Sequence, residues 1–481
     1  MIRFDPALLP ALLVAVSGCA LFGTSGCALF GTPEWEKPPP PAVDSPVVQK
    51  GSLQRAELDN GLEVMVLEDR SLPRVALGVT LRRGAGTEDP DQAGRAAFTA
   101  ELMKRGAGKR NALALAQATD EIGASLAVGA GWDSTTVQVA GLSRDLDLLL
   151  EILADVTLRP RFDAREARKA RSEILASLER AKDDPATLAN WQMARTLYGE
   201  HRYGSPLGGV PETVAELDAA ASRDYHRRVF VPNDAIFYAA GDVDLEELLP
   251  RVGAAFGAWD RRKVEDAGPA PPERVPTERR IAIVDRPDLA QARIILAHEG
   301  ISRTNEDRIA ASLMNTVVGG GGFSSRLMQS VRSDAGLTYS VGSGFALRRH
   351  PGPFYVSTFT RVSEVRAALD LLFAELERAR SDPPSEDELR DARSLRVGQF
   401  SLGLETSGAV MDSLVDLDVY GLPEDSLDTY RGRLRETTTA DTARMARERL
   451  HPDRAAIILV GPAEDLLPQV QDLGPVEVLK P

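Results

Sequence analysis

Residues that could bind a metal or attack a substrate are scarce in this chain, and their spacing excludes several kinds of site. The sequence has five histidines and two cysteines. No two histidines lie within five residues of each other, so the HxxEH, HExxH and HxH metal-binding patterns are all absent. Both cysteines, Cys19 and Cys27, lie near the amino terminus, which leaves the rest of the chain without a disulfide or a thiolate ligand. Metal and thiol chemistry are therefore disfavoured.

A run of four glycines is a sequence feature suited to contact a substrate. Gly319, Gly320, Gly321 and Gly322 precede Phe323. Glycines lack a Cβ atom, so the run predicts a loop that a peptide backbone can approach closely. Phosphate binding by this loop is disfavoured, because it lacks the GxxxxGKS/T pattern and has no lysine within reach. The loop is a candidate peptide-binding element.

The elements that position these residues must belong to more than one domain. The 481 residues of the chain exceed the ~100 to 200 that are usual for one domain. Hydrophobic residues make up 43% and charged residues 27% of the sequence, which excludes a disordered, collagenous or coiled-coil chain. The net charge of −14 disfavours nucleic acid as a partner. Arginines number 49, so any one of them is weak evidence for a function.

The first 18 residues have the pattern of a signal peptide. Arg3 precedes an apolar stretch from Ala7 to Val16, which is too short to remain in a bilayer as a spanning helix. The stretch that ends in Cys19 resembles a bacterial lipobox, which implies cleavage before Cys19 and lipidation of its thiol. Cys27 is a rival site because GCALFGT occurs twice. The remaining alternative is a cleaved secretory signal followed by an unmodified cysteine.

By the rule for Gram-negative lipoproteins, Ala20 after the lipobox cysteine implies an outer-membrane lipoprotein that faces the periplasm. Residues 19–52 include four consecutive prolines and predict a stiff, polar tether. The membrane contact expected of this chain is therefore through the lipid anchor alone.

The rest of the chain predicts two halves, residues 53–260 and 280–473. A charged, proline-rich linker at 261–279 separates them, and residues 474–481 are expected to form a tail. Each half closes on a short apolar strand that ends in glycine: the segment 232–241 (PNDAIFYAAG) is echoed by 452–461 (PDRAAIILVG). The echo indicates a duplicated unit.

Hydrophobic spacing predicts strands mixed with long helices in each half. Period-two alternation favours strands at 62–67, 75–81, 135–139, 280–284 and 292–297, and helical spacing favours helices at 146–158 and 165–180. Regular strand–helix–strand alternation is absent, which favours a layered α+β sandwich over a doubly wound sheet.

Ordered motifs over residues 53–473 resemble those of peptidase family M16, the insulinase- or pitrilysin-like family that includes the mitochondrial processing peptidase subunits. They are residues 58–62 (LDNGL), 84–106, Tyr203-Gly204 with Pro232-Asn233, and 319–341. The resemblance implies a clamshell of two duplicated α/β sandwich halves, each with two similar subdomains.

Active members of this family bind zinc through HxxEH on a helix, with a third ligand, Glu, some seventy residues later. Here Ala97 stands at the first His position, Ala100 at the catalytic Glu position and Glu101 at the second His position. Glu173 matches the third ligand, and Glu166 matches another acidic position. Two carboxylates without an imidazole make a poor zinc site, so this chain is expected to bind no metal. A surface ion pair between Glu101 and Arg105 is the simpler interpretation.

The second half retains two residues that the resemblance assigns to the active site. In active members an arginine and a tyrosine seven residues later project into the zinc site, and Arg332 and Tyr339 have this spacing. Guanidinium and phenol groups can hold a substrate carbonyl and stabilise an oxyanion. The alternative is that Arg332 pairs with Asp334 and that Tyr339 fills the core.

The resemblance leads to three hypotheses. The chain is a non-zinc subunit whose Arg332 and Tyr339 act in trans on unfolded peptides, with zinc held by an HxxEH-bearing partner. The second hypothesis is a non-catalytic envelope scaffold or peptide-binding protein with the same fold. The third, an autonomous zinc peptidase with rearranged ligands, requires stoichiometric zinc.

Overall fold

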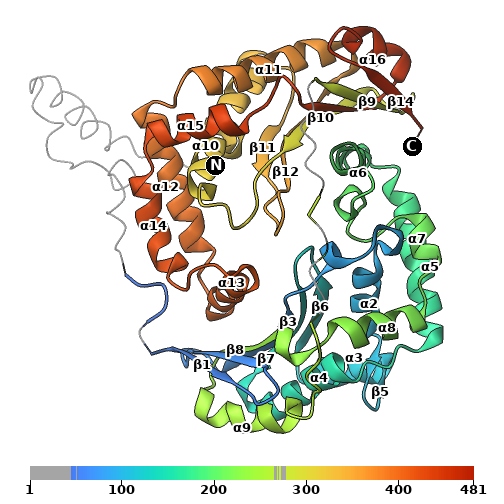
Figure 1. Ribbon diagram of the computed structural model, residues 1–481, viewed down its shortest axis with the longest axis vertical. Coiled ribbons are helices and arrows are strands. Elements are labelled where there is room, and N and C mark those ends of the chain that lie inside the picture. The colour runs from blue at the N-terminus through green and yellow to red at the C-terminus, as the bar shows by residue number, and fades with distance from the viewer. Residues whose placement is uncertain (1–44, 50, 265–267, 269, 272–277, 481) are drawn as a thin grey trace, which may run out of the picture. The chain divides into compact units, whose positions relative to one another are not determined.

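The computed structural model describes residues 45–49, 51–264, 268, 270–271 and 278–480. The expected signal peptide, Cys19, Cys27 and most of the tether lie outside these residues, as does much of the linker. From Pro46 onward the chain forms a compact unit with two six-stranded mixed sheets, one from each predicted half. The prediction of two duplicated α/β halves is confirmed (Figure 1). Each half has one large sheet rather than two similar subdomains, because all its long strands pair side by side.

The first sheet has the strand order β1-β2-β8-β3-β7-β6. Its strands are β1 (Leu53–Glu57), β2 (Glu63–Glu68), β3 (Arg74–Leu81), β6 (Ser125–Ala130), β7 (Thr135–Leu142) and β8 (Ala235–Gly241). β2 and β8 run parallel, and β3 is antiparallel to both β8 and β7. Every residue of β8 is buried, as expected of a central strand covered on both faces. A short ladder joins β4 (Gly106–Ala107) to β5 (Arg110–Asn111).

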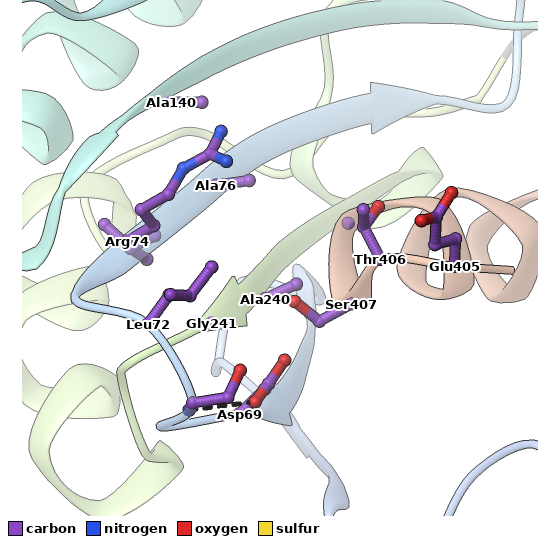
Figure 2. Close-up of a pocket in the computed structure, with 13 residues that line it drawn as sticks. Asp69, Leu72, Arg74, Ala76, Ala140, Ala240, Gly241, Glu405, Thr406 and Ser407 are labelled. Atoms are coloured by element: carbon purple, nitrogen blue, oxygen red, sulfur yellow. Dashed lines mark hydrogen bonds between the residues drawn. The ribbon is translucent and has the colours of Figure 1, made fainter. Parts of the chain in front are cut away.

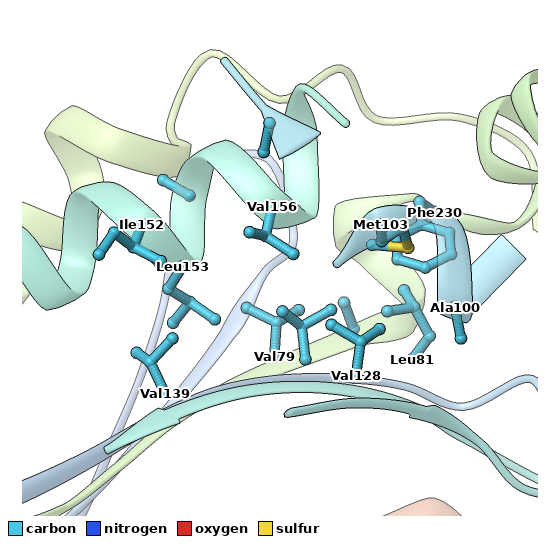
Figure 3. Close-up of a cluster of buried hydrophobic side chains, with 14 of the residues drawn as sticks. Val79, Leu81, Ala100, Met103, Val128, Val139, Ile152, Leu153, Val156 and Phe230 are labelled. Atoms are coloured by element: carbon cyan, nitrogen blue, oxygen red, sulfur yellow. The ribbon is translucent and has the colours of Figure 1, made fainter. Parts of the chain in front are cut away.

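Helices of the first half cover one face of this sheet. They include α2 (Arg95–Met103), α3 (Ala112–Asp120), α4 (Leu146–Leu158), α5 (Ala164–Ala181), α7 (Pro211–Ala215), α8 (Ala219–Val229) and α9 (Leu245–Phe256). Figure 3 shows Leu153 and Val156 of α4 above Val79, Val128 and Val139 of the sheet. Each such buried side chain contributes about 1.5 to 3 kcal/mol, so this layer anchors α2 and α4 on the sheet.

The second sheet has the order β11-β12-β10-β13-β9-β14. Its strands are β9 (Arg280–Asp285), β10 (Gln291–Glu299), β11 (Val341–Phe345), β12 (Pro353–Arg361), β13 (Ala456–Gly461) and β14 (Val476–Leu479). The helices of this half are α10 (Arg308–Asn315), α11 (Val365–Ser381), α12 (Glu386–Leu402), α13 (Ser407–Tyr420), α14 (Ser426–Glu436), α15 (Thr439–Arg449) and α16 (Ala463–Val470).

The strand orders show the duplication directly. Read from β6, the first sheet runs β6-β7-β3-β8-β2-β1, which matches β11-β12-β10-β13-β9-β14 position by position. The segments that echo each other in sequence end in β8 and β13, which occupy equivalent central places. The match ends at the last strand, because β1 is antiparallel to β2 whereas β14 is parallel to β9.

Each half contributes one helix that packs on the sheet of the other half. Helix α6 (Pro185–Tyr198) belongs to the first half, but its Leu188, Ala189 and Met193 pack on β9, β10 and β13 of the second sheet. Conversely, α13 of the second half packs Met411 and Leu414 against β2 and β8 of the first sheet. Each sheet is therefore covered by its own helices on one face and by a helix of the other half on the opposite face.

Two expected boundaries differ from the structure. The segment 474–481, expected to be a tail, contains β14, which extends the second sheet by one strand. Val47 and Val48, expected to lie in the tether, pack against the cluster between α13 and the first sheet. Both segments are short and carry too few apolar residues for sequence spacing alone to reveal a packed element. Among the described residues, no helix combines the length and the apolarity needed to cross a membrane.

Candidate functional site

Helix α2 carries the positions at which the M16 pattern places its zinc ligands. The helix starts after Gly94, whose φ of 95° suits glycine. The buried carboxylate of Glu88 caps this end by accepting hydrogen bonds from the backbone amides of Gly94, at 3.1 Å, and Ala96. Ala97 and Glu101 are one turn apart and partly exposed, whereas Ala100 is only 3% exposed and packs in the core. The position of the catalytic Glu in active members is thus an apolar core position here (Figure 3).

Arg105 binds the acidic side chains that remain around α2. Its Nη2 donates to Glu101 Oε1 at 2.8 Å and to Glu173 Oε2 of α5 at 2.7 Å. Its Nη1 also lies 3.9 Å from Glu166 Oε2. The expected ion pair between Glu101 and Arg105 is confirmed, and Glu166 and Glu173 lie close to the same guanidinium. A guanidinium therefore provides the positive charge between these carboxylates.

Protonation of this cluster follows from its hydrogen bonds. Partial burial raises the pKa of Glu101, but hydrogen bonds from Lys104 and Arg105 outweigh burial and hold that pKa below its usual value. Burial lowers the pKa of Arg105, and the bonds to Glu173 and Glu101 more than reverse this effect. The Glu101 carboxylate is therefore ionised and already paired.

These donors do not fit zinc. The set contains carboxylates but no imidazole, and Arg105 already pairs with Glu101 and Glu173. Within the part of the chain that the structure describes, no three His, Cys, Asp or Glu side chains are grouped so as to share a metal ion. Structural zinc sites use four ligands and catalytic sites three. The carboxylates around α2 therefore lack the imidazole donors of a zinc site.

The four-glycine segment lies against β11. It spans the end of a π-helical turn (Thr316–Gly320) and the turn that follows. A Cβ added at Gly319 would come within 2.4 Å of the Ser343 hydroxyl oxygen and 2.7 Å of a Leu327 methyl group. Glycine is therefore required here for close packing against β11. Phe323, directly after the glycines, is 71% exposed.

Arg332 lies between two aromatic rings. Its Cζ is 4.5 Å from the ring centroid of Phe323 and 4.4 Å from that of Tyr339, within the range of cation–π contacts. Tyr339 is 73% exposed, so the alternative that it fills the core is wrong. Asp334 accepts from Gln329 at 2.7 Å, and no ion pair joins it to Arg332 among the described residues. The structure thus brings Phe323, Arg332 and Tyr339 together on an exposed surface.

A second arginine sandwich, which the sequence did not indicate, joins the two halves. The Arg348 Cζ, in the loop between β11 and β12, is 4.1 Å from the Trp132 ring centroid and 4.6 Å from that of Tyr203. Arg202 pairs with Glu88 at 2.7 Å, and both side chains are at most 2% exposed. Glu88 in turn caps α2, so this network connects α2 to the second half. Because arginines are so frequent, no local pattern distinguished Arg348 or Arg202.

Two hydrogen bonds near Arg348 also join the two halves. Asp133 Oδ2 accepts hydrogen bonds from the Tyr420 hydroxyl at 2.8 Å and from the Arg349 backbone amide at 2.9 Å. Tyr420 ends α13, which packs on the first sheet. The loop between β11 and β12 is therefore held by both charge and hydrogen bonds.

A separate pocket lies on the first sheet beside the start of α13. Figure 2 shows its floor, made by Ala76, Ala140 and Ala240, and the wall formed by Glu405, Thr406 and Ser407. None of the site residues named above lines this pocket. It does not form part of the candidate site.

Comparisons with known proteins agree on one family. The family model described as Insulinase (Peptidase family M16) matches residues 64–210, and the model described as Peptidase M16 inactive domain matches residues 216–395. A Streptomyces coelicolor protein described as an uncharacterized zinc protease is 29% identical over 422 residues, which cover 86% of this chain and 91% of that protein.

Solved structures share the fold. A peptidase M16 inactive domain from Pseudomonas fluorescens has a TM-score of 0.79 at 25% identity, covering 85% of this chain and 98% of that chain. The periplasmic protease PqqL from Escherichia coli has a TM-score of 0.71 at 18% identity. That likeness covers 88% of this chain but 49% of PqqL.

Proposed function

Because the chain belongs to peptidase family M16, we propose that it is the non-zinc subunit of a heterodimeric M16-type metallopeptidase. In this proposal a partner with an intact HxxEH motif holds zinc and the catalytic base, and the two subunits enclose an unfolded peptide. This chain contributes the glycine segment 319–322 and the side chains of Arg332 and Tyr339.

The observation that carries the proposal is the contrast between two sets of residues. At α2 the zinc-ligand positions hold Ala97 and Glu101, and Arg105 neutralises the carboxylates. Tyr339, in contrast, is 73% exposed, and its ring lies beside the Arg332 guanidinium. A donor pair that is ordered by ring stacking and open to solvent is suited to act on a site outside its own chain.

The chemistry of these donors is oxyanion stabilisation. When a peptide carbonyl is attacked, its oxygen gains negative charge, which the Arg332 guanidinium and the Tyr339 hydroxyl can stabilise by hydrogen bonds. Zinc in the partner would supply the activated water, and this chain would orient the carbonyl.

The size of a related enzyme supports a two-chain assembly. This chain matches about half of the periplasmic protease PqqL, which shares its fold. A second subunit of similar length would bring the assembly to the size of that protease.

We place the assembly at the cell envelope, with Cys19 carrying the lipid and the outer membrane as its location. The signal-like residues 1–18 and the lipobox-like sequence before Cys19 support this placement. The interaction with the membrane would be through the acyl chains alone.

The test is reconstitution with an HxxEH-bearing homologue from the same genome. Tyr339→Phe removes only the hydroxyl and should lower kcat of the complex by about 10²- to 10³-fold, the usual effect of losing an oxyanion donor, with KM little changed. Arg361→Lys, which changes an exposed arginine of β12, is the matched control. Failure of the two chains to associate, or full activity of the Tyr339→Phe complex, would favour the non-catalytic scaffold instead.

A further inference from the structure

A group of four arginines lies where α10, α12 and α14 pack together. The group, called the arginine cluster below, comprises Arg303, Arg308, Arg396 and Arg433. Arg303 precedes α10, Arg308 begins it, and the other two come from α12 and α14. All four side chains are half-buried. Three separate segments of the chain thus bring positive charge to one place.

Hydrogen bonds to the α10 segment fix the guanidinium positions. Arg433 Nη2 donates to the carbonyl of Glu306 at 3.2 Å, and Arg308 Nη1 donates to the carbonyl of Asn305 at 3.5 Å. Arg396 donates to the hydroxyl of Ser312, one helical turn after Arg308 on α10. The guanidinium groups therefore line the first turns of α10.

Among the described residues, the cluster has fewer carboxylate partners than arginines. Arg303 pairs with Asp416, but Arg308, Arg396 and Arg433 form no ion pair within the described residues. Burial, together with repulsion from Arg433 and Arg303, lowers the pKa of Arg308. Like charges held close together in a half-buried place are unfavourable unless a counter-charge is present. In a chain with a net charge of −14, such a cluster requires a specific reason.

The surface beneath the cluster is rigid. Leu434 of α14 and Leu389 of α12 are fully buried against Ile309 and Leu313 of α10. The Tyr430 ring packs on this apolar group and lies 4.6 Å from the Phe400 ring. Because these helices are fixed by packing, the guanidinium groups are held in place without a bound partner.

We propose that the arginine cluster binds a multiply charged oxyanion of the phosphate class. Three guanidinium groups that have no carboxylate partner among the described residues match the charge and the several acceptor oxygens of a phosphate, whereas a single carboxylate would leave positive charge unpaired. The ligand would be either free phosphate or the phosphate of a lipid headgroup. This proposal does not depend on the peptidase proposal, because no residue of the cluster belongs to the candidate site.

Inorganic phosphate is the first probe, applied to the full chain at constant ionic strength with sodium chloride as the reference salt. Calorimetric titration should show saturable binding, and phosphate should raise the Tm. Arg308→Gln and Arg433→Gln should each weaken binding by roughly tenfold or more, since each removes a charged hydrogen bond. Arg144→Gln, at an arginine whose side chain is 77% exposed, is the matched control and should bind normally.

The two variants measure the same loss of phosphate binding independently of each other. In phosphate-free buffer Arg308→Gln should be at least as stable as the wild type, because it relieves repulsion, and Arg433→Gln provides a second measure should the first variant fold poorly. The proposal is overturned when phosphate stabilises no more than chloride, or when both variants bind phosphate as the wild type does.

The source of the phosphate is decided by a second probe. Glycerophosphoglycerol, the soluble headgroup of phosphatidylglycerol, carries a phosphodiester. Binding of both probes supports a lipid headgroup, and binding of inorganic phosphate alone supports a free phosphate ligand. Binding of neither refutes the site.

Discussion

The role of Arg105 as the cation among the α2 carboxylates can be tested by introducing histidines at the two motif positions. Ala97→His and Glu101→His together would restore two imidazoles one turn apart on α2, with Glu173 as the third ligand. Both positions are partly exposed, so imidazoles there can be accommodated. The double variant should still bind zinc weakly, because Arg105 keeps its 2.7 Å bond to Glu173.

The expected change in zinc affinity follows from the strength of the hydrogen bond between Arg105 and Glu173. A hydrogen bond between charged groups contributes about 1.5 to 3 kcal/mol when buried. The Glu173 side chain is 50% exposed, so solvent screening reduces the value to about 1 kcal/mol. Zinc must overcome this amount to recruit Glu173. Adding Arg105→Ala to the double variant should therefore tighten zinc binding about fivefold.

The assay is competition between the protein and a chelating dye of known zinc affinity. Lys104→Ala, placed on the same double variant, is the matched control, because it removes a neighbouring positive charge that forms no ion pair with Glu173 among the described residues. It should leave the zinc affinity unchanged. Equal zinc affinity with and without Arg105 would refute the assignment of Arg105 as the competing cation.

Three other measurements test buried charge, a buried histidine and ring stacking in this protein. Arg202→Met should lower the free energy of unfolding by about 3 to 5 kcal/mol, because it leaves the Glu88 carboxylate buried without its partner; a loss below about 1 kcal/mol in urea denaturation would contradict this. Burial lowers the pKa of His298 to about 4 from 6.5, so the unfolded chain takes up a proton that the folded chain excludes. The free energy of unfolding should then decrease as pH falls from 6.5 toward 4, by about 3 kcal/mol from this group, and His298→Gln should remove that part of the pH dependence. Phe323→Leu should weaken stacking on Arg332 by about 0.5 to 1 kcal/mol, so phenylglyoxal should modify Arg332 roughly twofold to fivefold faster in peptide mapping; an unchanged rate would count against the stacking.

Local patterns allowed much of the fold to be predicted. The helix predicted at 146–158 is α4 with the same bounds, because its apolar residues repeat at helical spacing and lie on one face. The echoed segments at 232–241 and 452–461 end in equivalent strands, β8 and β13. Loss of the metal motif was likewise visible in the sequence, because residue type alone decides whether an imidazole is present.

Other features required the tertiary structure. Apolar spacing shows that a helix has a buried face, but it does not say which sheet covers that face. The exchange of α6 and α13 between the halves was therefore not predictable, and neither was the pairing of β14 with β9.

The sequence by itself determined the duplicated α+β halves and the absence of a zinc motif, since periodicity and residue type are local properties. Only the tertiary structure decided that Arg105 joins Glu101 to Glu173, 68 residues away from it, and that Arg332 is ordered between two exposed rings. The physical reason is that charge pairing and ring stacking depend on distances of a few ångströms between side chains. Those distances are set by how helices and sheets pack, and residue spacing along the chain does not specify them.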